Sequence, residues 1–72
     1  MRSMFNKNLK YYRLKNNMSM KELASLAGVS PMAISHYESG EGKPGMETIK
    51  ALAQALGVKV TDFLSSRNEN LV

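Results

Sequence analysis

The apolar residues of this chain recur three and four positions apart, which is the spacing of one face of an α-helix. Phe5, Leu9 and Tyr12 mark such a face near the start of the chain. No run alternates apolar and polar residues as a half-buried strand does. The pattern predicts an all-α domain, a compact bundle of five helices over residues 4–16, 20–27, 31–39, 46–56 and 60–64.

Polar residues mark where several of these helices begin and end. Ser19 and Glu22 have the S-x-x-E spacing of a capping box, in which each side chain accepts the other's free backbone N–H. Ser30 and Pro31 are typical of the N-cap and first helical position. Asn17 is the residue most able to take the left-handed conformation after the first helix. Met18 and Met46 are expected in the core.

The second and third predicted helices are joined by only residues 28–30. Helices this short, with a glycine at such a brief turn, cannot lie antiparallel and must meet at a wide angle, as in a helix-turn-helix. In that arrangement the second helix of the pair enters the major groove of DNA, and the first crosses the phosphate backbone.

Composition narrows the class of protein. With 72 residues the chain holds one domain, predicted over residues 1–65 with a polar tail or linker at 66–72. It has no cysteine and no apolar run of the roughly 20 residues that span a membrane, so we expect a cytoplasmic domain with no membrane partner. The net charge of +4 and pI near 9.6 favour a polyanionic partner such as nucleic acid.

Catalysis is not predicted. One histidine, no cysteine and scattered acidic residues offer neither a nucleophile beside a base nor a metal cluster. No glycine-rich phosphate loop follows a strand. We therefore expect no enzyme activity, no cofactor and no metal.

From Leu9 to Leu64 the sequence resembles the Cro/repressor-type helix-turn-helix domains of the XRE family. The resemblance is carried by LA at residues 23–24, GVS at 28–30, IS at 34–35, E-x-G at 38–40, Pro44 and LGV at 56–58. It implies a five-helix, lambda-repressor-like bundle that binds double-stranded DNA, usually as a homodimer on a palindromic operator.

The resemblance also implies roles for individual positions. Base contacts fall on the exposed side of the third helix, at Pro31, Met32, Ser35 and His36. Phosphate contacts fall on Ser19, Met20, Ala33, Ser39 and Lys43. A structural ion pair falls on Arg13 and Glu38, and dimer contacts are expected at Val60, Phe63 and Leu64.

Two positions depart from what the family commonly has. Met20 stands where a glutamine often donates a hydrogen bond to a phosphate, so contact there must come from backbone N–H groups at the helix start. Pro31 and Met32 stand where long polar side chains often read bases. Met32 either contacts a thymine methyl or is merely tolerated, whereas the imidazole of His36 can donate to guanine.

The third helix carries no lysine or arginine, so its electrostatic attraction to DNA must come from neighbouring residues. We expect Lys10, Lys21 and Lys43 to face the phosphates. The alternative for Lys7, Lys10, Lys15 and Lys21 is a solvated surface without a DNA contact. The predicted function is sequence-specific DNA binding by a prokaryotic or phage transcriptional regulator. The alternative is an antitoxin-like or protein-interaction module, or the N-terminal domain of a larger protein.

Overall fold

The computed structural model describes residues 5–64, and in this range it contains five helices and no strand. The helices are α1 (Phe5–Lys15), α2 (Met20–Ala27), α3 (Pro31–Ser39), α4 (Met46–Leu56) and α5 (Val60–Leu64). The predicted all-α class is confirmed, and α1 is slightly shorter than the predicted 4–16. Residue 4, residue 65 and the predicted tail at 66–72 lie outside the described residues.

The predicted caps are present at the start of α2 and α3. The Ser19 hydroxyl accepts a hydrogen bond from the Glu22 N–H at 3.0 Å, and the Glu22 carboxylate accepts one from the Ser19 N–H at 2.8 Å. The Ser30 hydroxyl accepts from the Ala33 N–H at 3.1 Å. Asn17 has φ of +56°, which confirms the left-handed turn after α1.

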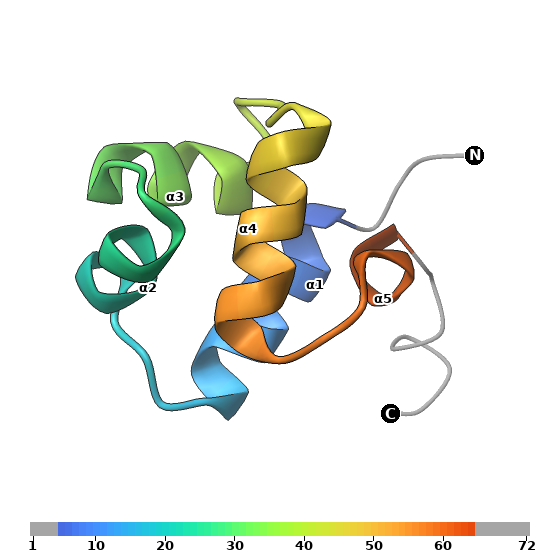
Figure 1. Ribbon diagram of the computed structural model, residues 1–72. Coiled ribbons are helices and arrows are strands. Elements are labelled where there is room, and N and C mark those ends of the chain that lie inside the picture. Colours follow the sequence, from blue (N-terminus) through green and yellow to red (C-terminus); the bar gives the residue numbers. More distant parts are fainter. Residues whose placement is uncertain (1–4, 65–72) are drawn as a thin grey trace.

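The helices pack around one core, with α2 and α3 on one side of the bundle and α5 on the other (Figure 1). α2 packs against α3 and α4, while α1 packs against α3 and α5. The short connection at residues 28–30 leaves α2 and α3 as a pair on the surface. No helix among the described residues is long and apolar enough to span a bilayer.

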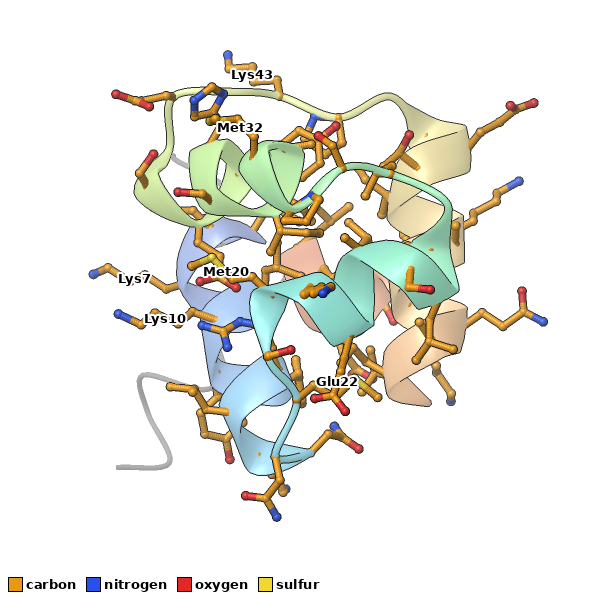
Figure 2. The ribbon with its side chains drawn as sticks, turned by 90° about the vertical axis from the view of Figure 1, so that its left-hand side faces the viewer. Lys7, Lys10, Met20, Glu22, Met32 and Lys43 are labelled. Carbon is orange, nitrogen blue, oxygen red and sulfur yellow. The ribbon has the colours of Figure 1, made fainter. Side chains whose placement is uncertain are left out.

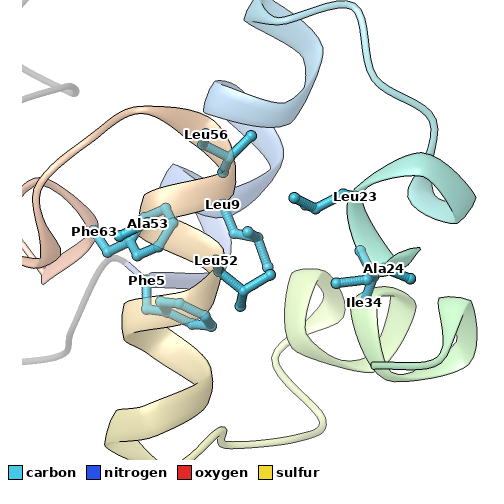
Figure 3. Close-up of a cluster of buried hydrophobic side chains, with 9 residues drawn as sticks. All are labelled: Phe5, Leu9, Leu23, Ala24, Ile34, Leu52, Ala53, Leu56 and Phe63. Atoms are coloured by element: carbon cyan, nitrogen blue, oxygen red, sulfur yellow. The ribbon is translucent and has the colours of Figure 1, made fainter. Parts of the chain in front are cut away.

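Nine buried apolar residues, drawn in Figure 3, form the core. They are Phe5, Leu9, Leu23, Ala24, Ile34, Leu52, Ala53, Leu56 and Phe63. The Phe63 ring meets the Phe5 ring edge to face, with centroids 5.3 Å apart. Every helix contributes at least one of these residues, so the core depends on all five.

Of the two methionines expected in the core, Met18 is half-buried against it. Met46 is 52% exposed, so the prediction for Met46 is wrong. Met46 is the first residue of α4 and lies at the edge of the bundle. Helical spacing identifies the apolar face of a helix, but it does not tell where along the helix the packing partners end.

Candidate nucleic-acid interface

The outer side of α3 carries the four side chains predicted to read bases. Pro31, Met32, Ser35 and His36 are all exposed, and Met32 is 65% exposed. Ile34, on the opposite side of the helix, is fully buried. The helix therefore presents an outward surface of one imidazole, one hydroxyl and two apolar side chains.

A buried ion pair attaches α3 to α1. Arg13 Nε donates to Glu38 Oε2 at 2.6 Å, and Arg13 Nη2 donates to Glu38 Oε1 at 3.1 Å. A third donor, Arg13 Nη1, binds the carbonyl oxygen of Met18 at 2.8 Å. The predicted pair is confirmed, and its two-point geometry fixes the orientation of α3 as well as its position.

The sequence analysis missed Glu41, whose carboxylate Oε1 lies 3.8 Å from His36 Nε2. The contact is too long for a hydrogen bond, and both side chains are at least half exposed. It arises because Gly40 turns the chain back, so that the Glu41 N–H donates to the His36 carbonyl at 2.9 Å. The signal was the acidic residue directly after the helix-ending Ser39-Gly40.

At three of the predicted phosphate-contact positions, polar groups of the residue already form hydrogen bonds within the chain. The Ser19 N–H and Ser19 Oγ take part in the capping box, and the Ala33 N–H donates to Ser30. The Ser39 hydroxyl donates to the His36 carbonyl at 3.0 Å. Met20 and Lys21 are the first two residues of α2, and the backbone N–H groups of a helix's first turn have no partner within the helix. These two amides at the start of α2 are open donors.

Lysine side chains surround this surface. Figure 2 views the side of the molecule that carries α2 and α3 and shows Lys10 projecting from α1 and Lys43 from the loop after α3. Met20 and Met32 lie on the same side, between these two lysines. Lys10, Lys21 and Lys43 are exposed, as is Lys7, which projects beside Lys10. The arrangement places positive charge around a mostly neutral helix.

The predicted dimer residues do not form one surface. Phe63 is fully buried in the core and its side chain cannot reach a second copy, so its assignment to the dimer surface is wrong. Val60 is half-buried, and Leu64 is 43% exposed. A helix of five residues has one inward side, and Phe63 is its only buried residue.

Within the described range, no group of three histidine, cysteine, aspartate or glutamate residues could hold a metal ion. The chemistry available on the α2–α3 side is hydrogen bonding, apolar contact and attraction of anions.

Comparison with known proteins agrees with this description. The model of the Helix-turn-helix family matches residues 9–63. The HTH-type transcriptional activator BcrR of Enterococcus faecalis is 38% identical over 61 residues, which are 85% of this chain and 30% of the activator. The chain thus spans less than a third of that relative's length.

Two solved structures show the fold in different settings. The P22 c2 repressor, in complex with a synthetic operator, has a TM-score of 0.83 and 28% identity, over 89% of this chain and 97% of the repressor chain. Hydroxypropylphosphonic acid epoxidase from S. wedmorenis has a TM-score of 0.80 and 28% identity, over 88% of this chain but only 34% of the enzyme chain.

Proposed function

Because the chain belongs to the helix-turn-helix family, we propose that it is a DNA-binding transcriptional regulator, or the DNA-binding domain of one, that reads a specific duplex sequence. The observation that carries the proposal is α3 itself, a helix fixed by a buried ion pair whose outer side chains are all exposed. The likeness to a repressor solved with its operator supports the same role.

In this proposal α3 enters the major groove with its N-terminal end first. His36 donates to guanine O6 or N7, and Ser35 adds a hydroxyl that can donate or accept. The exposed Met32 contacts a thymine methyl, which is the apolar group that the major groove offers. Discrimination thus rests on one imidazole, one hydroxyl and apolar contact.

Affinity comes mainly from outside α3. Lys10, Lys21 and Lys43 neutralise phosphates, and each contact releases condensed counterions. The open amides of Met20 and Lys21 hold one phosphate at the start of α2, where the helix dipole also favours an anion. The Met20 side chain is then not needed as a hydrogen-bond donor.

The regulator acts in the cytoplasm of a prokaryote as a homodimer on a palindromic operator. A two-fold dimer places the two copies of α3 roughly 34 Å apart, which is one turn of DNA. Leu64 and the exposed part of Val60 provide the contact between copies. This contact is small, so the dimer forms mainly on DNA.

Selection from a random duplex library tests the proposal. We expect a palindromic consensus whose half-sites lie one helical turn apart. Binding of a selected duplex should weaken by about 10³-fold or more between 50 and 200 mM salt if six or more phosphates are neutralised by the two subunits. Failure to enrich any sequence, together with no binding at low salt, would refute DNA binding.

His36→Ala should relax base preference at one position of each half-site. The expected loss is about 1–3 kcal/mol of discrimination at that position, with stability changed by no more than about 0.5 kcal/mol because the side chain is 50% exposed. Lys43→Ala is the control, since loss of a phosphate contact weakens all sequences alike and lowers the salt slope by about 1. An unchanged consensus for His36→Ala would remove this residue from the base contacts.

A second candidate is that the domain belongs to a longer protein with another activity. The epoxidase, of which the matched region covers 34%, shows that this fold occurs within an enzyme chain. An antitoxin-like or protein-interaction role belongs to the same class of alternatives. The library selection distinguishes DNA binding from a protein-interaction role, since a domain that serves only protein contacts enriches no DNA sequence.

A further inference from the structure

Asn8 is a buried polar side chain of α1 that hydrogen-bonds to α5. It is 3% exposed, and its Nδ2 donates to the carbonyl oxygens of Asp62 at 3.0 Å and Phe63 at 2.6 Å. Both acceptors are in α5, more than fifty positions away in the sequence. Asn8 thus connects the beginning of the domain to its last described helix.

α5 depends on such contacts because it is too short to be stable alone. Its first turn is capped by its own Asp62, whose carboxylate accepts from the Lys59 N–H at 2.9 Å. The carbonyl groups of its last turn have no partner within the helix, as in every helix end. Asn8 satisfies two of them, and they directly precede the exposed Leu64.

Phe63 alone does not fix the orientation of α5. Its ring is buried against Phe5 and Tyr12, and this anchors one side of the helix without directional bonds. Two hydrogen bonds from one amide to adjacent carbonyls define a direction as well as a distance. The position from which Leu64 emerges therefore depends on Asn8.

We propose that Asn8 is a positioning residue for dimerisation, which holds the end of α5 so that the surface at Leu64 fits a second copy of this chain on the operator. The inference rests on the proposed function, since it requires two copies bound to one palindromic site. α1 then holds α3 through Arg13 and α5 through Asn8, so one helix sets the geometry of both surfaces.

The test compares binding to a palindromic duplex with binding to a single half-site, both taken from the library selection. The affinity of Asn8→Ala for the half-site should lie within about twofold of the parent's affinity, because α3 and its ion pair are unchanged. The advantage on the palindrome is the ratio of the affinity for the palindrome to the affinity for the half-site. For Asn8→Ala this ratio should fall by about tenfold, as expected when two carbonyl groups lose their donor.

Asn16→Ala is the matched control. The Asn16 Nδ2 also donates to a backbone carbonyl, that of Tyr12 at 2.8 Å, but Asn16 directly follows the last residue of α1 and is exposed. Asn16→Ala should keep the full advantage on the palindrome. If Asn8→Ala does not fold, Asn8→Ser, which retains one donor, is measured in the same way, and a smaller loss is expected.

A double variant tests whether Asn8 acts by positioning Leu64 or by weakening DNA binding in general. Leu64→Glu should itself abolish the advantage on the palindrome, and adding Asn8→Ala should then change nothing further. Equal losses on half-site and palindrome for the Asn8 variants would overturn the inference, as would an unchanged advantage. A parent protein that binds no duplex refutes the proposed function, whereas a parent that binds without any advantage on the palindrome refutes only the dimer and this inference.

Discussion

Glu38→Ala is expected to lower the melting temperature by about 15 °C or more, because breaking a buried ion pair costs about 3–5 kcal/mol. The Glu38 side chain is 4% exposed and its two oxygens accept from Nε and Nη2 of Arg13. Its removal leaves the Arg13 guanidinium, 9% exposed, without a counter-charge. Thermal unfolding followed by circular dichroism measures the effect.

The control is Glu41→Ala, which removes an exposed carboxylate from the same side of the domain. Glu41 is 70% exposed and its carboxylate lies 3.8 Å from His36, so its loss should change stability by no more than about 0.5 kcal/mol. If Glu38→Ala proves as stable as Glu41→Ala, the pair does not stabilise the fold. α3 would then be held by packing through Ile34 instead.

Phe63→Ala is expected to destabilise the monomer by about 3–5 kcal/mol, the usual cost of removing a buried aromatic ring. The side chain is fully buried and packs edge to face against Phe5 and Tyr12. In a domain this small, such a loss is a large part of the total stability. Urea unfolding at several protein concentrations measures it, and the midpoint should not depend on concentration.

Leu64→Ala is the neighbouring control, because the Leu64 side chain is 43% exposed. It should leave the unfolding midpoint nearly unchanged, within about 0.5 kcal/mol, while weakening binding to the palindrome. A midpoint for Phe63→Ala that shifts with protein concentration would contradict the core assignment. It would place Phe63 at a contact between copies after all.

Local signals in the sequence predicted most of the fold. Ser19 with Glu22, and Ser30 with Pro31, act within four residues of each other, so their effect on the backbone depends little on the rest of the chain. Asn17 likewise adopts the left-handed turn expected from its own side chain. Because these interactions are short-range, the observed helix ends lie close to the predicted ones.

The errors lie where residues distant in sequence meet. Met46 and Phe63 both follow helical spacing, but only packing against other helices decides that Met46 is exposed and Phe63 is buried. The sequence also predicted the exposed side of α3, whereas Glu41 beside His36 depended on the turn at Gly40. The signal in the sequence was the acidic residue directly after Ser39-Gly40, but the turn was needed to place it beside His36.

The sequence by itself determined the five helices, their caps and, through the family motifs, the Arg13–Glu38 pair, because these follow from short-range chemistry or recurring spacing. The tertiary structure alone decided which backbone groups are hydrogen-bonded between distant parts of the domain and how α5 is held. Asn8 gives no local signal, since its acceptors lie more than fifty residues away. Hydrogen bonds of that kind exist only after the core has brought α1 and α5 together.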